Sequence, residues 1–249
     1  MDAPPDVQLK LLDLQEVDSA IDRLAHRRRT LPELAEIERL DSRIGELRDD
    51  VVRVQTEISD VDREQRKIEN DVDVVRNRIE KDQQRLDSGA VGSAKELEGL
   101  QHELGSLAKR RGDLEDLVLE QMERKEEADV RLRAFTEELE ALTAARGAAE
   151  VTRDTSLAEI DRDTADHQVS RRDLAESLAG PLLDLYEKIR TTGGGVGAAA
   201  LHRGRCEGCH LSLPPSDLSR IKAAAADEVL RCEECRRILI RRPDSGLTS

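Results

Sequence analysis

The chain has 249 residues, a formal net charge of −14 and charged side chains at 38% of its positions. It contains two aromatic residues, Phe135 and Tyr186, and no tryptophan. Because aromatic side chains bury the most apolar area per residue, this composition excludes a large globular core. The regular recurrence of Leu, Ile and Val in turn excludes a disordered chain.

Both ends of the sequence carry information about the cellular compartment of the protein. The first ten residues lack the basic and apolar regions of a secretory signal, and no apolar run approaches the roughly 20 residues that span a bilayer. We therefore expect a cytoplasmic protein with no membrane partner. All four cysteines lie near the C-terminus, and a reducing cytoplasm favours metal binding over disulfides.

Helical patterns dominate residues 1–190. A first helix is predicted over 7–29, ahead of Pro32, which ends one helix and starts another. Heptad repeats then cover 44–86 and 97–142, with apolar residues at most a and d positions. Heptads sustained over this length predict a coiled coil.

A short turn separates the two repeats. Residues 87–92 read Asp-Ser-Gly-Ala-Val-Gly, and the glycines permit the positive φ values that end a helix. Ser93 and Glu96 then match a capping box for the next helix. A short turn makes the two helices antiparallel neighbours, and a register centred on it places Ile68 opposite Arg111.

The pattern changes after residue 180. Gly180 and Pro181 end the second repeat-bearing helix, and a short helix is predicted over 182–190. Residues 191–200 are rich in glycine, which predicts a flexible linker. A phosphate-binding loop is disfavoured, because no Lys-Ser/Thr follows the glycines and no strand-to-helix unit surrounds them.

Two CxxC pairs separated by 22 residues carry the clearest chemistry: Cys206 with Cys209, and Cys232 with Cys235. Two such turns supply a tetrahedral shell of four thiolates for one Zn²⁺. Two disulfides or a redox pair are the alternatives, and the reducing compartment and the lack of a βαβ pattern disfavour them. Four thiolates leave no position for water, so we expect a structural zinc and not a catalytic one.

The predicted fold class is mainly α: a long antiparallel coiled-coil hairpin with a small C-terminal β-containing zinc ribbon. Within the ribbon, a helix is predicted over 216–226 and short strands over 229–231 and 238–240. Zinc should supply most of the ribbon's folding free energy, because its apolar core is small. The predicted domains are the hairpin at 1–190, the linker at 191–200, the C4 zinc ribbon at 201–242 and a tail at 243–249.

Three segments carry a resemblance to a known family: 95–103 after the turn, 183–190, and 232–239 around the last CxxC pair. In them the chain resembles the bacterial coiled-coil-hairpin proteins with a C-terminal C4-type zinc ribbon, over nearly its whole length. The family usually has Gly where Arg236 stands, and Asn-Pro where Ser93 and Ala94 stand. The resemblance implies the hairpin and ribbon fold and a protein partner in gene-expression regulation. The partnership with sigma-54 described for some members is not carried over.

Two hypotheses of function follow. The first is a non-enzymatic adaptor for protein–protein interaction, because no acid–base pair or nucleophile–base motif stands out and no small-molecule substrate is implied. The second is nucleic-acid binding by the ribbon, which is more basic than the rest of the chain but has no aromatic side chain to stack on bases. Its candidate phosphate contacts are Arg203, Arg205, Arg220, Lys222, Arg231, Arg236, Arg237, Arg241 and Arg242.

Overall fold

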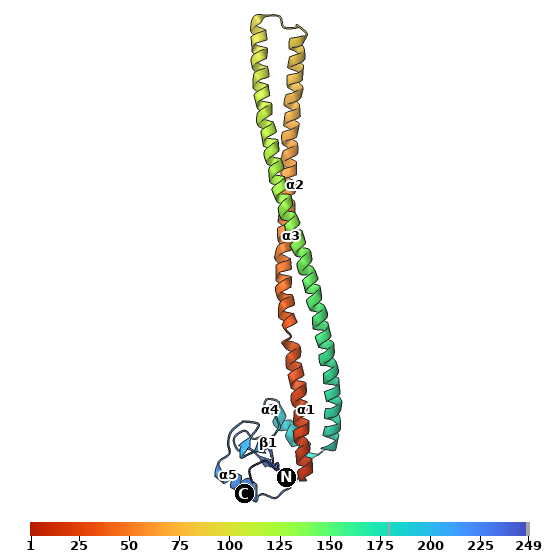
Figure 1. Cartoon of the computed structure of the whole chain (residues 1–249), viewed down its shortest axis with the longest axis vertical. Coiled ribbons are helices and arrows are strands. Elements are labelled where there is room, and N and C mark those ends of the chain that lie inside the picture. The colour runs from red at the N-terminus through yellow and green to blue at the C-terminus, as the bar shows by residue number, and fades with distance from the viewer. Residues whose placement is uncertain (179, 248–249) are drawn as a thin grey trace. The chain divides into compact units, whose positions relative to one another are not determined.

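The computed structural model describes residues 1–178 and 180–247. The chain divides into two compact units, one formed by Ala35–Glu150 and the other by Met1–Leu34 together with Val151–Ser249. We call the first the arm and the second the ribbon unit. Helix α3 contributes residues to both units, and its course is shown in Figure 1.

Proline marks the start of most helices. The helices α1 (Pro5–Arg29), α2 (Pro32–Asp87), α4 (Pro181–Thr192) and α5 (Pro215–Ala223) each begin at a proline. This position suits proline, because its fixed φ matches the helix and its missing N–H has no partner in the first turn. Helix α3 (Ala94–Ser177) begins instead at the capping motif of the turn. None of the helices in the described part of the chain is long and apolar enough to cross a membrane.

The arm consists of α2 and the first part of α3, joined by the predicted turn (Figure 1). Gly89 has φ +66°, as the turn requires. Ser93 Oγ accepts a hydrogen bond from the Glu96 N–H at 3.2 Å, and Glu96 Oε2 accepts one from the Gly92 N–H at 3.2 Å. The capping motif is therefore present, with the return bond made to Gly92.

The heptad repeat forms the seam of the arm. Its buried apolar members include Ile44, Leu47, Val54, Val61, Ile68, Val72, Leu100, Leu114 and Ala128. Exposed ion pairs join the two helices on either side, such as Arg43 with Glu138 at 2.9 Å and Lys125 with Asp62 at 2.7 Å. Exposed pairs of this kind contribute roughly 0–1 kcal/mol each, so the apolar seam provides most of the arm's stability.

The predicted register was wrong by one seam layer. Ile68 packs in a cluster with Leu114 and Val118, and the cross-helix ion pairs of Arg43 with Glu138 and Lys125 with Asp62 agree with this pairing. The loop between the helices, residues 88–93, is centred one residue later than the predicted turn, which moves the facing positions on α3 toward its C-terminus. Arg111 pairs with Glu115 on its own helix.

We predict that Arg111→Leu stabilises the arm by on the order of 1 kcal/mol. The Arg111 Nε is buried and lies 3.4 Å from Glu115 Oε1 without making a hydrogen bond within the described residues. Leucine at this seam position removes that desolvated group and adds apolar contact. Thermal unfolding of this variant should show a higher midpoint, and Arg110→Leu, at an exposed neighbouring position, should not. A lower midpoint for Arg111→Leu would show that the guanidinium has a stabilising partner.

The ribbon unit contains a four-stranded sheet with the order β2-β1-β4-β3. The strands are β1 (Ala198–His202), β2 (Arg205–Cys206), β3 (Leu230–Arg231) and β4 (Ile238–Ile240). Strand β1 is antiparallel to β2 and parallel to β4, and β3 is antiparallel to β4. The two strands 229–231 and 238–240 predicted from the sequence are confirmed as β3 and β4, whereas β1 and β2 were not predicted.

The two faces of this sheet belong to different cores. Ala198, Ile238 and Ile240 pack with Tyr186 and with leucines of α1 and α4. Leu239, between the two isoleucines, packs on the other side in a cluster that contains Cys206 and Cys232. This alternation is the period of two expected for a strand that is buried on both faces.

The segment 191–200 is not the flexible linker that the glycines predicted. It contains the end of α4 and most of β1, and a Cβ added at Gly197 would lie 2.7 Å from Tyr186 Cδ2. The Gly197 N–H also donates to the buried Gln15 Oε1 at 2.7 Å. The glycine is thus required for close packing against an aromatic ring. The prediction failed because three alanines in a row give no strand signal, although their small side chains fit the space beside α1 and α4.

A buried polar cluster joins α1 to α4 and α3 within the ribbon unit. The Asp18 carboxylate is 1% exposed, and it accepts hydrogen bonds from Tyr186 Oη and Arg171 Nε, each at 2.6 Å. Burial, together with the bond to Asp18, raises the pKa of Tyr186 above its ordinary value. The Tyr186 hydroxyl therefore stays protonated and donates a hydrogen bond that stabilises the buried Asp18 carboxylate.

Tyr186→Phe is expected to lower the free energy of unfolding by about 1–3 kcal/mol, because it removes one donor from the buried Asp18 carboxylate. Chemical denaturation followed by circular dichroism measures this change. Thr191→Val is a suitable control, since its hydroxyl is exposed and bonds only the Glu187 carbonyl of the same helix. Equal stability of Tyr186→Phe and the wild type would mean that the Asp18 cluster does not support the unit.

Candidate metal centre

The four cysteines lie together in the ribbon unit. All four Sγ atoms are within 4.8 Å of one another. The pairs Cys206–Cys235 and Cys209–Cys232 have Sγ–Sγ distances of 3.9 Å. A zinc–sulfur bond of about 2.3 Å in tetrahedral geometry gives sulfur–sulfur edges of roughly 3.8 Å, so the donors present fit one zinc ion. Among the described residues, no other group of His, Cys, Asp or Glu is close enough to hold a metal.

The two CxxC turns have the same backbone geometry. In the first, the His210 N–H donates to the Cys206 carbonyl at 2.8 Å, and in the second the Arg236 N–H donates to the Cys232 carbonyl at 2.9 Å. The Cys206 and Cys232 N–H groups each donate, at 3.0 Å, to the carbonyl five residues further along the chain. These bonds close each turn and direct both thiols to the same point.

The residue that follows each pair adopts a left-handed conformation. His210 has φ +61° and Arg236 has φ +63°, a region that favours glycine. An arginine directly before each pair compensates, because Arg205 Nε donates to the His210 carbonyl at 2.6 Å and Arg231 Nε donates to the Arg236 carbonyl at 2.7 Å. The sequence pointed to position 236 as one where glycine is usual, but it gave no sign that His210 occupies the corresponding position of the first turn.

Burial makes two of these thiols, Cys206 and Cys232, poorer acids in the absence of a cation. It raises the pKa of the Cys206 thiol to about 12, and it raises the pKa of the Cys232 thiol as well. A bound divalent cation compensates the charge of thiolates in such surroundings. All four positions of the tetrahedron are taken by sulfur, so the zinc is structural and leaves no open site for catalysis.

The basic residues proposed for nucleic-acid contact mostly serve the ribbon itself. Arg237 donates to the carbonyls of Val196, Gly208 and Gly193, at 3.1, 2.6 and 2.8 Å. Arg241 donates to four carbonyls at the end of α5 and in the following loop, between 2.6 and 3.1 Å.

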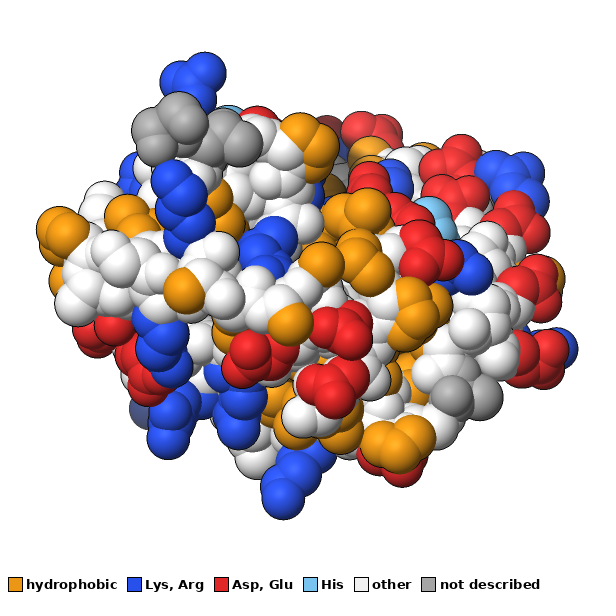
Figure 2. All heavy atoms as spheres, turned by 90° about the horizontal axis from the view of Figure 1, so that it is seen from below, with side chains coloured by type: hydrophobic (Ala, Val, Ile, Leu, Met, Phe, Trp, Pro, Cys, Tyr) orange, Lys and Arg blue, Asp and Glu red, His pale blue; other side chains and the backbone are white. Residues whose placement is uncertain are grey.

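Other members of this basic set form ion pairs. Arg220 and Arg236 both pair with Glu233, and Arg242 lies 3.5 Å from Asp244. Lys222 also has a partner. In the described part of the chain, Arg203 alone among the nine has a side chain outside such contacts. In Figure 2, basic side chains on the visible face are interspersed with acidic and hydrophobic ones.

The N-terminus is part of the ribbon, which the sequence did not indicate. Asp2 forms an antiparallel bridge with Glu228, and the Ala3 N–H donates to the Asp227 carbonyl at 2.7 Å. The buried Gln8 amide of α1 donates to the carbonyls of Ala3 and Asp227, at 2.7 and 3.1 Å. These three contacts tie the start of the chain to the edge of the sheet beside β3.

The predicted tail, 243–249, also takes part in the fold as far as the structure describes it. The Arg203 N–H donates to the Asp244 carbonyl at 2.9 Å, and the Gly204 N–H donates to the Ser245 carbonyl at 2.8 Å. Leu247 packs against the core around the cysteines. Residues 248 and 249 lie outside the described residues.

Comparison with known proteins agrees with this architecture. The CT398-like coiled coil hairpin domain matches residues 14–194, and the C4-type zinc ribbon domain matches residues 205–239. The chain belongs to the CT398-like coiled-coil hairpin family. It is 39% identical over 234 residues to the uncharacterized protein Rv2229c of Mycobacterium tuberculosis, covering 94% of this chain and 95% of that protein.

Solved structures share the fold. One from Mycobacterium smegmatis superimposes with a TM-score of 0.84 at 34% identity, covering 97% of this chain and all of the other. CT398 from Chlamydia trachomatis gives a TM-score of 0.70 at 21% identity, covering 95% of this chain and 98% of the other. The second likeness concerns the fold alone.

Removing zinc should open the ribbon and release the N-terminus with it. Structural zinc contributes on the order of 10 kcal/mol to the folding of small domains, and the Ala3 N–H depends on a ribbon carbonyl. Hydrogen exchange measured after chelation, or in Cys232→Ser, should speed up in β1–β4 and at Ala3, while the arm keeps its protection. An Ala3 amide that stays protected without metal would show that the N-terminal contacts form independently of the zinc site.

We predict that Arg236→Gly stabilises the zinc-bound ribbon by about 0.5–1 kcal/mol, because glycine adopts φ +63° without steric cost. The exposed ion pair with Glu233 that is lost contributes less than this. Arg236→Ala should show no gain, since alanine keeps the strain. Denaturation of the zinc-bound forms compares the three proteins, and a destabilised Arg236→Gly would indicate that the side chain has a further structural contact.

Proposed function

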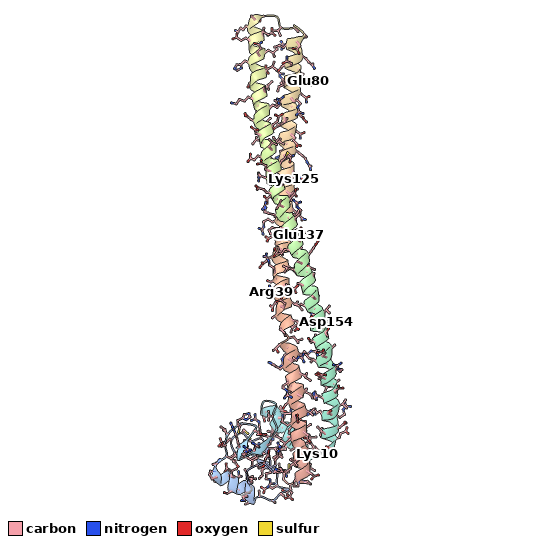
Figure 3. The ribbon with its side chains drawn as sticks, viewed as in Figure 1. Lys10, Arg39, Glu80, Lys125, Glu137 and Asp154 are labelled. Atoms are coloured by element: carbon pink, nitrogen blue, oxygen red, sulfur yellow. The ribbon has the colours of Figure 1, made fainter. Side chains whose placement is uncertain are left out.

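We propose that this protein is a non-enzymatic cytoplasmic adaptor whose arm binds a protein partner, in a process connected with gene-expression regulation. The observation that supports this most strongly is the completeness of the arm. Its two helices bury the apolar side chains of the seam against each other, so the outward surface is not needed for folding. Figure 3 shows side chains projecting along both helices, including those of Glu80, Lys125 and Glu137.

The chemistry of the rest of the chain supports the same proposal. A zinc held by four thiolates has no open coordination position, and the residues described offer no second metal cluster. Several apolar side chains of the arm are more than half exposed, among them Val74 at 68% and Val130 at 53%. Apolar side chains on an otherwise charged surface suit contact with another protein.

Nucleic-acid binding by the ribbon is the less favoured function. Most of its arginines donate to backbone carbonyls or pair with carboxylates, so phosphate binding would have to break those contacts. We expect no tight binding of RNA or DNA in a filter-binding titration, even at low salt. Strong binding with a steep salt dependence would reverse the order of the two functions.

Photo-crosslinking in the native cell tests the adaptor function. A photoreactive amino acid at the exposed positions Val74 and Val130 of the arm should give the same discrete protein adduct at both. Leu211, a half-exposed ribbon residue, is the matched position outside the arm. A lack of arm adducts, or adducts from Leu211 alone, would contradict a role for the arm.

A further inference from the structure

One face of the arm is hollowed between its two helices. Two adjoining open hollows, of about 500 and 520 Å³, share Leu119 in their linings. They follow α3 from Glu115 to Arg133, which is about 27 Å at 1.5 Å per residue. We call these two adjoining hollows together the α3 groove. Its length suits a helix of roughly five turns.

The floor of the α3 groove is apolar and only partly covered by the arm. Val72 and Val118 belong to the edge of the seam, while Leu119 is 57% exposed and Met122 is 51% exposed. The positions 115, 118, 119 and 122 recur at helical spacing on one face of α3. Leu119 and Met122 lie beside the seam and are more than half exposed, so they contribute little to holding the arm together. Methionine is adaptable in shape and frequent at surfaces that bind helices.

The rim of the α3 groove is mainly acidic. Six carboxylates line it, and they are Glu69, Asp73, Glu115, Glu123, Glu126 and Asp129. The lining holds three basic groups, and Arg76 pairs with Asp73 at 2.9 Å and Lys125 with Asp62 at 2.7 Å, while Glu115 pairs with Arg111. The rim therefore carries an excess of negative charge beside exposed apolar side chains.

We propose that the α3 groove binds a basic amphipathic helix of a protein partner. This inference rests on the proposed adaptor function and specifies the chemistry of the partner. Leucine-like side chains of the incoming helix cover Leu119 and Met122, and its lysines or arginines meet the carboxylates of the rim. The charge also argues against a second copy of this chain as the occupant, because two such grooves packed together would place acidic rims face to face.

A binding experiment with the full-length, zinc-bound protein tests this assignment. The probe is a fluorescently labelled 18-residue synthetic peptide with Leu at helical spacing on one face and Lys on the other. Its anisotropy should rise on titration with the wild-type chain. Leu119→Ser combined with Met122→Ser should weaken binding at least about tenfold, because both side chains are exposed and their loss does not affect the seam. Val52→Ser, at a side chain 60% exposed elsewhere on the arm, should leave it unchanged.

The negative charge of the groove rim and the helical spacing of leucine in the probe are tested separately. Glu123→Gln with Glu126→Gln should weaken binding and reduce its dependence on salt. A scrambled peptide of the same composition should bind much more weakly. The proposal is overturned if the scrambled peptide binds equally, or if the Leu119/Met122 variant binds as the wild type does. It is also overturned if sedimentation shows a dimer that this variant abolishes, since the occupant would then be a second copy.

Failure of the peptide to bind can be told apart from failure of the adaptor function, because crosslinking tests the latter independently. Discrete arm adducts in cells without peptide binding would leave the adaptor function standing and remove the α3 groove as its site. Peptide binding that depends on Leu119 and Met122 supports the groove assignment even if Val74 and Val130 give no adduct.

Discussion

The convergence of four cysteine thiols on one point is the constraint on which the ribbon unit depends. With sulfurs within 4.8 Å of one another, the two CxxC turns must face each other, and this sets the positions of the strands that lead into them. The strained backbone at His210 and Arg236 is held for the same reason, since each turn has to close around its pair. The arginines before each pair then satisfy the carbonyls that this geometry leaves directed outward.

The ribbon and the helices of its unit form one structure and not two modules joined by a spacer. Tyr186 packs against the close approach of Gly197 while its hydroxyl stabilises the buried Asp18 carboxylate. The N-terminal residues add a second attachment, at the edge of the sheet beside β3. A ribbon attached both before β1 and beside β3 has a defined orientation on α1 and α4. The small residues at 197–200 allow the close approach that this packing needs.

The arm has a different physical basis. Its stability comes from a repeated apolar seam, and exposed ion pairs form both within single helices, as for Arg39 with Glu36, and between them, as for Arg43 with Glu138. Such an arm has no interior in which a reaction could be sheltered from water. Its outward surface is instead extended and charged, with apolar side chains at a few positions. These features support the proposed recognition of a partner.

The sequence by itself determined the hairpin, its turn, the start of each helix to within about two residues and the four clustered cysteines, because all of these follow from local patterns: heptads, glycine and proline positions, and CxxC spacing. Tertiary structure decided the rest. The register moved by a layer because it depends on where α2 ends, and Ile68 met Leu114 as a result. Strand β1 and the N-terminal bridge formed because neighbouring elements supplied their hydrogen bonds and covered their small side chains. The basic residues of the ribbon could be counted in the sequence, but only the folded chain showed that their donors are directed to its own carbonyls, since those carbonyls lie far away along the chain.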